Sequence, residues 1–123
     1  MSWVYKSQLL GENNCHIKDV RVGMHIIVQY PVWNKDQYTG AAIAGRWNSM
    51  IKNLIVHEQG HITRNVQIAN ELVAALNAMP SVPCEQFIQR AEAIIAQYVR
   101  ALEASNSSYD HATNHGQTQG AIF

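Results

Sequence analysis

One long helical pattern, from about residue 41 to residue 79, constrains the fold of this chain more than any other feature. Apolar residues recur along it with the roughly 3.6-residue period of a helix, and Pro80 and Pro83 end it. On a helical wheel centred on Leu54, the apolar side chains lie within about 60° of that residue. They are Trp47, Met50, Ile51, Ile68, Ala69, Leu72 and Leu76, and the far side carries Lys52, Gln59, Thr63, Gln67, Asn70 and Asn77. Such a stripe predicts a helix packed against other elements.

Three ionisable residues, His57, Glu58 and His61, interrupt this stripe in the run LIVHEQGHIT. By the same wheel they lie within about 60° of Leu54, on the buried face. A buried imidazole or carboxylate loses its hydration and needs a partner. The two histidines are one helical turn apart, so their rings meet, and two neutral imidazoles there can ligate one divalent cation. The spacing therefore predicts a metal site.

The pattern is HExxH, the helix motif of zinc hydrolases. Zinc binds imidazole nitrogens, and a catalytic site keeps one position for water, whose pKa the metal lowers. Glu58 is expected to reach that water and to act as general base and then general acid. The motif thus predicts a Zn²⁺-dependent metallopeptidase that hydrolyses peptide bonds. The alternative is two structural histidines bonded to buried backbone groups, with Glu58 paired to an arginine.

The rest of the chain predicts one α+β domain over residues 1–123, with a small antiparallel sheet packed on two long antiparallel helices. The sheet is expected within residues 1–33, as strands at 2–8, 15–22 and 24–33, followed by a loop at 34–40. A second helix is predicted over residues 83–105. Its inner face is Phe87, Ala91, Ile94, Ile95, Tyr98 and Leu102. Residues 106–123 show no period and predict an irregular tail that completes the site.

Two histidines do not complete a zinc site, so a third protein ligand is expected. Glu71 lies about 15 Å further along the helix than His61 and is out of reach. Glu103 falls beside the inner face of the second helix and is better explained as a solvated charge. The tail segment YDHATNHG leaves the second helix level with the histidines and offers better candidates.

In this tail we favour His115 as the third ligand, because Gly116 permits an unusual backbone turn beside it. Asp110 is the alternative ligand, or it hydrogen-bonds the distal nitrogen of a ligating histidine. Tyr109 is expected to donate a hydrogen bond to the developing oxyanion. An exposed sheet edge at residues 24–31 is expected to hold a peptide or protein substrate by strand addition.

Composition narrows the classes of function. Nine basic and nine acidic residues, with a pI near 7.0, favour neither nucleic acid nor a membrane as partner. No apolar run approaches the ~20 residues of a membrane span, and no signal peptide is visible. Cys15 and Cys84 form one disulfide or stay free, and their number alone favours free thiols. Two rival functions remain, a non-catalytic zinc-binding module and a helical-hairpin domain for protein interaction.

The segments RWNSMIKNLIVHEQGH and YDHATNHGQTQGAIF together resemble DUF922, a bacterial family of unknown function described as secreted zinc-dependent proteases. The resemblance implies a zincin-like fold, zinc at His57 and His61, and a catalytic Glu58. It also implies that further residues belong to the site or its frame, namely Tyr109, Asp110, Thr113, His115, Gly116 and Gln119. Finally, it implies that Cys15 and Cys84 pair and that the protein is secreted or periplasmic.

Overall fold

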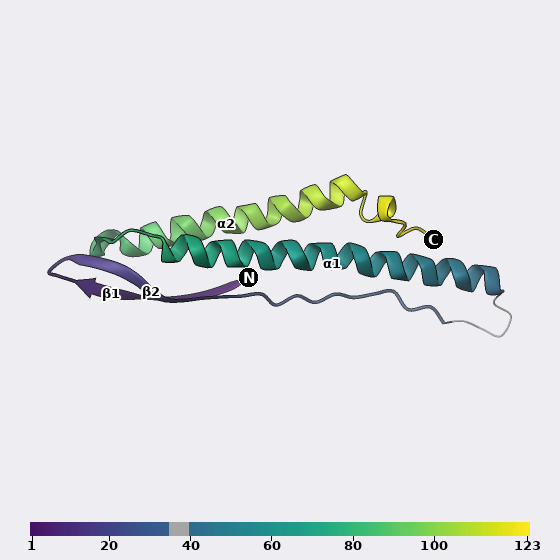
Figure 1. Cartoon of the computed structure of the whole chain (residues 1–123), viewed down its shortest axis with the longest axis horizontal. Coiled ribbons are helices and arrows are strands. Elements are labelled where there is room, and N and C mark those ends of the chain that lie inside the picture. Colours follow the sequence, from purple (N-terminus) through teal and green to yellow (C-terminus); the bar gives the residue numbers. More distant parts are fainter. Residues whose placement is uncertain (35–39) are drawn as a thin grey trace.

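The structure, a computed structural model, describes residues 1–34 and 40–123. Its architecture is α+β, as predicted, with two long helices lying antiparallel and a sheet beside one end of them (Figure 1). The elements are β1 (Ser2–Leu10), β2 (Asn14–Gly23), α1 (Ala41–Asn77), β3 (Val82–Pro83), α2 (Cys84–Thr113) and the short 3₁₀ helix η1 (Gln117–Gln119). The loop predicted at 34–40 falls largely on residues 35–39, which lie outside the described residues.

The sheet is antiparallel, with the strand order β1-β2-β3. The strands predicted at 2–8 and 15–22 are confirmed as β1 and β2, which pair from Ser2 opposite Gly23 to Leu10 opposite Asn14. A β-bulge interrupts this ladder after Val4, where Asp19 adopts a positive φ of 53°. The two-residue strand β3 pairs with the start of β2 and so ties the sheet to the beginning of α2.

The strand predicted at residues 24–33 is wrong. The β1–β2 ladder ends at the pair Ser2–Gly23, so β1 offers no backbone partner to the residues that follow Gly23. Residues 24–34 instead run alongside α1 without joining the sheet (Figure 1). Their first side chains alternate, with Met24, Ile26 and Val28 half-buried and the residues between them exposed. The predicted sheet edge at 24–31 is therefore an unpaired segment.

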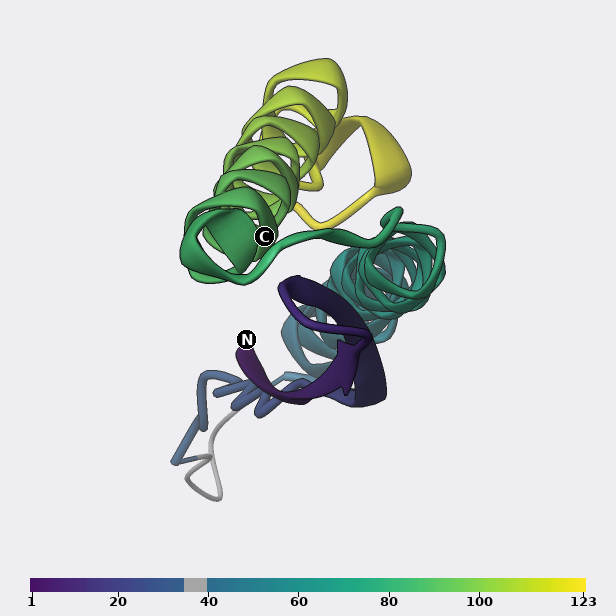
Figure 2. The same cartoon turned by 90° about the vertical axis from the view of Figure 1, so that its left-hand side faces the viewer.

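Both helices bury the predicted faces. The residues buried in α1 are Met50, His57, Ile68, Ala69, Leu72 and Leu76, and the residues predicted on its far side are exposed. The apolar core lies at the sheet end, where β2 packs against both helices (Figure 2). Leu72, Leu76, Ala91 and Ile95 are its most buried members. Neither helix is long and apolar enough to cross a membrane.

The second helix ends at Thr113 rather than at residue 105. Its last turns, SNSSYDHAT, have weak helix propensity, but Tyr109 and Thr113 are buried against α1. Tertiary packing therefore outweighs local preference here. Asn114, in the left-handed conformation with φ 49°, ends the helix, and the His115 N–H donates to the carbonyl of Asp110 at 2.8 Å.

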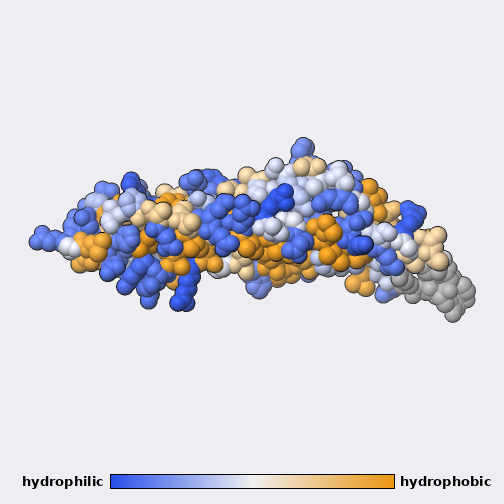
Figure 3. Space-filling model, viewed as in Figure 1, coloured by the Kyte–Doolittle hydropathy of each residue, from blue (hydrophilic) through white to orange (hydrophobic). Residues whose placement is uncertain are grey.

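The surface shown in Figure 3 mixes hydrophilic and apolar side chains along the whole length of the molecule. On α1 the exposed apolar residues include Ile55, Val56 and Val66, each about half-exposed. Apolar residues scattered singly among polar ones are ordinary on a protein surface and by themselves indicate no partner.

Candidate metal centre

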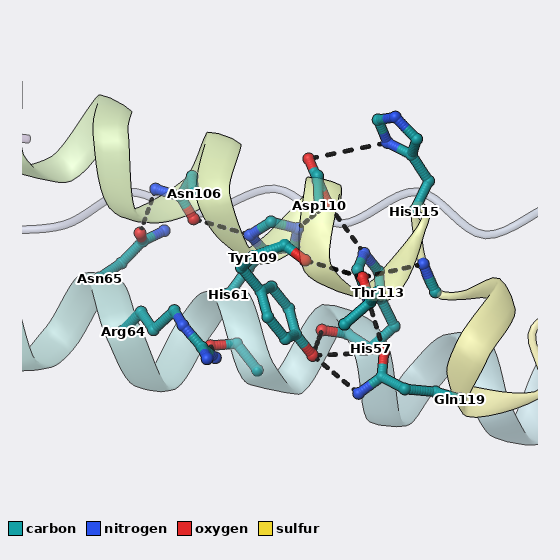
Figure 4. Close-up of polar contacts among 12 residues, drawn as sticks. His57, His61, Arg64, Asn65, Asn106, Tyr109, Asp110, Thr113, His115 and Gln119 are labelled. Atoms are coloured by element: carbon teal, nitrogen blue, oxygen red, sulfur yellow. Dashed lines mark hydrogen bonds and ion pairs between the residues drawn. The ribbon is translucent and has the colours of Figure 1, made fainter.

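His57 and His61 lie one turn apart in the middle of α1 and point toward α2, where Asp110 faces them (Figure 4). Their ring centroids are 4.9 Å apart. Asp110 Oδ1 lies 3.1 Å from His57 Nε2 and 2.8 Å from His61 Nε2. The three ligand atoms all lie within 4.8 Å of one another, and they come from residues that are buried or half-buried.

The other ring nitrogen of His57 belongs to a closed hydrogen-bond ring with Tyr109 and Gln119. The Tyr109 hydroxyl donates to the backbone carbonyl of His57 at 3.0 Å, and Gln119 Nε2 donates to that hydroxyl at 3.0 Å. Gln119 Oε1 then faces His57 Nδ1 at 2.8 Å. Because an amide oxygen only accepts, Nδ1 carries the ring proton and Nε2 keeps its lone pair.

His61 is arranged in the same way. Its Nδ1 lies 2.7 Å from the amide oxygen Oδ1 of Asn106, so the proton again sits on Nδ1. Histidines that ligate metals typically donate their other ring N–H to such a partner, which fixes the tautomer and the ring orientation. Both Nε2 lone pairs are therefore directed at the Asp110 carboxylate.

This donor set fits a divalent cation. Two imidazole nitrogens and a carboxylate oxygen lie within 4.8 Å of one another, close enough to bind a single ion together. His57 is only 3% exposed, so its ring is shielded from bulk water. Two histidines with one carboxylate are a common ligand set for catalytic zinc. His57, His61 and Asp110 could thus hold Zn²⁺.

Tyr109 does not point toward the ligand atoms. Figure 4 shows its ring between Arg64 and His57, with the Arg64 guanidinium carbon 3.9 Å from the ring centroid and the His57 ring stacked at 4.8 Å. The hydroxyl lies over Gly60, where an added Cβ would overlap it. It donates to the backbone carbonyl of His57 and so helps to hold that residue, and its expected role as oxyanion donor stays a prediction.

His115 lies outside the group of ligand atoms. Its Nδ1 is 3.9 Å from Asp110 Oδ2, and its side chain is 77% exposed. The structure therefore favours Asp110 over His115 as the third ligand, because α2 continues as a helix and presents Asp110 directly to α1. Gly116 packs on the His57 ring, where a Cβ would lie 3.0 Å from its Cγ.

The remaining predicted site residues take different places. Glu58 is half-buried, and within the described part of the chain it forms no hydrogen bond or ion pair. The buried Thr113 hydroxyl donates to the carbonyl of Tyr109 at 2.8 Å and accepts from the N–H of Gly116 at 3.1 Å, which braces the end of α2. Glu103 is exposed, as expected for a solvated charge.

Cys15 and Cys84 form a disulfide, with their Cα atoms 4.9 Å apart. The pairing agrees with the family resemblance and overturns the preference for free thiols that the cysteine count suggested. The bond lies at the sheet end, where Cys15 in β2 pairs with Val82 and Cys84 begins α2. It is thus remote from the ligand group and serves the frame of the fold.

Three residues of the site were missed by the sequence analysis: Asn106, Arg64 and Gly60. A glycine inside a helical pattern signals a close approach by another group, and Gly60 was open to that interpretation. No comparable signal marks Asn106, because it stands in a polar stretch with no period. The role of Arg64 depends on its contact with the Tyr109 ring from α2, which is distant in the sequence.

The fold and the site together define an α+β domain in which a His–His–Asp group of metal-ligand type joins two antiparallel helices. The family model described as Bacterial protein of unknown function (DUF922) matches residues 1–116, and the chain belongs to this family. No curated protein and no solved structure shows a significant match. The matched region includes His57, His61, Asp110 and His115 and ends before Gln119.

Proposed function

We propose that this protein is a zinc-dependent metallopeptidase of zincin-like type, with Zn²⁺ held by His57, His61 and Asp110. The observation that carries the proposal is the convergence of His57 Nε2, His61 Nε2 and Asp110 Oδ1, with both Nδ1 protons committed to amide oxygens. Two histidines with a carboxylate oxygen between their Nε2 atoms, and with both Nδ1–H groups donating to fixed acceptors, have the arrangement of a zinc-ligand set.

When bound, zinc would polarise the carbonyl of the substrate and make water acidic enough to lose a proton near neutral pH. Glu58 follows His57 on α1, is half-buried, and is engaged by no other described residue. Its carboxylate is thus free to accept the proton of the attacking water and to pass it to the leaving amine. Gln119 and Asn106 accept from the Nδ1–H groups of His57 and His61, which orients both rings with Nε2 toward Asp110.

The substrate would be an extended peptide or protein segment, because residues 24–32 run beside α1 without belonging to any strand or helix. An extended ligand gains main-chain hydrogen bonds along such a segment, and alternate side chains give specificity. Ile27 and Val32, which are 74% and 88% exposed, are apolar contacts that this segment presents. The disulfide supports an oxidising compartment, so we propose secretion or a periplasmic location.

The test compares the wild-type protein with Glu58→Gln. Both should bind one zinc ion per chain, measured by elemental analysis after reconstitution at neutral pH. Only the wild type should cleave casein or a peptide library, with activity in the variant lower by about 10²- to 10⁴-fold.

Two results would contradict the proposal in different ways. Zinc binding without hydrolysis by the wild type would favour the non-catalytic zinc-binding module. A protein that takes up no stoichiometric metal would favour the helical-hairpin interaction domain, and it would sink the zinc interpretation altogether.

A further inference from the structure

Asn106 lies one turn before Asp110 on α2 and bridges α2 to α1 beside the ligand group (Figure 4). Its Oδ1 is 2.7 Å from His61 Nδ1. Its Nδ2 donates to Asn65 Oδ1 at 2.7 Å and to the backbone carbonyl of Leu102 at 2.9 Å. One amide group therefore contacts two residues of α1 that are themselves one turn apart, His61 and Asn65.

The orientation of this amide follows from its partners. A backbone carbonyl only accepts, so the NH₂ group of Asn106 must face Leu102, and its oxygen must face His61. That oxygen in turn requires a proton on His61 Nδ1. The lone pair of the neutral ring is then at Nε2, 2.8 Å from Asp110 Oδ1. Leu102 thus indirectly sets the tautomer of His61.

We propose that Asn106 is a positioning residue that selects the tautomer of His61 and holds its ring toward Asp110. The second contact, to Asn65, fixes the amide against α1, so that the ring and its partner are carried by the same two helices. Because its side chain is a neutral amide, Asn106 fixes the proton on His61 Nδ1 without adding a second negative charge beside Asp110. Its effect on metal binding rests on the proposed metal centre, whereas its effect on the tautomer does not.

The test uses the full chain with Asn106→Leu, which has similar volume but no acceptor, and Asn106→Asp, which keeps an acceptor for His61. Asn70→Leu, at an exposed position of α1, is the matched control. Circular dichroism checks folding, and Asn106→Ser, too short to reach the ring, replaces the leucine variant if that variant does not fold. Two quantities are measured, the histidine tautomers of metal-free protein by ¹H–¹⁵N NMR and Zn²⁺ affinity by chelator competition.

In the wild type, His61 should be a single Nδ1–H tautomer, and in Asn106→Leu it should become a mixture. Zn²⁺ affinity should fall by about 10- to 100-fold in Asn106→Leu, as expected for a partner of a ligating histidine, and remain within about tenfold of wild type in Asn106→Asp. The control should match the wild type in both measurements.

A folded Asn106→Leu protein that keeps the single tautomer, or that binds Zn²⁺ as tightly as the wild type, would overturn the proposal. A wild-type protein that binds no Zn²⁺ would instead defeat the proposed function. The tautomer comparison in metal-free protein would still decide whether Asn106 positions His61, so the two failures are distinguishable.

Discussion

At the scale of single residues, Asp110 on α2 and not His115 in the tail lies beside the two histidines of α1. Asp110 Oδ1 faces both Nε2 atoms, whereas His115 reaches only the other carboxylate oxygen, at 3.9 Å. The reason is that α2 remains helical through Thr113, so Asp110 is presented by a rigid element one turn after Asn106. A carboxylate on a helix can be placed more accurately than an imidazole on a tail.

The third-ligand assignment predicts the order of two substitutions. Asp110→Asn should reduce Zn²⁺ affinity by at least about 100-fold, because it removes the one negative ligand, while His115→Ala should reduce it by less than about tenfold. Chelator competition on the two folded variants measures both values. The opposite order would return the ligand role to His115.

Two glycines within α1 should respond in opposite directions to alanine. Gly60→Ala places a Cβ in the space held by the Tyr109 hydroxyl and should lower the free energy of unfolding by about 1–3 kcal/mol. Gly45→Ala meets nothing within 4 Å on the same helix and should raise it by about 0.5–1 kcal/mol. Denaturant titration measures both, and a stabilising Gly60→Ala would show that Tyr109 does not occupy this space.

At the scale of elements, α1 is the helix along which three separate groups of contacts are arranged. Its C-terminal half buries Leu72 and Leu76 in the core, and its middle carries His57 and His61. Its first turns contact Trp33 and Phe123 through Trp47, which together form an aromatic cluster. Arg46 binds the backbone oxygen of Phe123 at 2.7 Å, which fastens the tail that carries Gln119. The helix therefore aligns three separate clusters.

The contact between β1 and α2 predicts a pH dependence of stability. Burial, together with the hydrogen bond and the charge of Glu92, raises the pKa of Tyr5 from 10.0 to about 12. The folded state therefore favours neutral Tyr5, and this contribution is complete below pH 10 and is lost as the pH rises through about 12. As the pH rises from 10 to about 12, the free energy of unfolding should therefore fall more for the wild type than for Tyr5→Phe.

Denaturant unfolding at several alkaline pH values measures this difference, because other groups that titrate are common to both proteins. Glu92→Gln should give an intermediate slope, since it removes the charge but not the burial. If the unfolding free energies of the wild type and Tyr5→Phe fell equally with rising pH, folding would not raise the pKa of the Tyr5 hydroxyl.

At the scale of the whole molecule, stability and chemistry occupy different ends of the helix pair. The apolar core and the disulfide lie at the sheet end, while His57 and His61 lie further along α1, where their side chains make polar contacts with α2 and the tail. A small domain with a modest core gains from a covalent link that joins distant parts of the chain. The disulfide joins residues 69 positions apart.

Removing this link should affect stability but not the centre. Cys15→Ser combined with Cys84→Ser should lower the free energy of unfolding by about 4 kcal/mol, from the loss of loop closure in the unfolded chain. Zn²⁺ affinity of the folded variant should stay within about threefold, because sites far apart act independently. Denaturant titration and chelator competition measure the two effects. A large loss of Zn²⁺ affinity would contradict this expectation, because it would show that the disulfide influences the His57, His61 and Asp110 group.

The sequence alone was sufficient for what depends on local periodicity. The two helices, their buried faces, the first two strands and the HExxH pair follow from apolar spacing and from the energetic cost of burying charge. Only the tertiary structure decided the end of α2, the place of Asp110, and the roles of Asn106, Gly60 and Gln119. These depend on contacts between residues some 40 to 60 positions apart, which outweigh weak local propensities and leave no periodic trace in the chain.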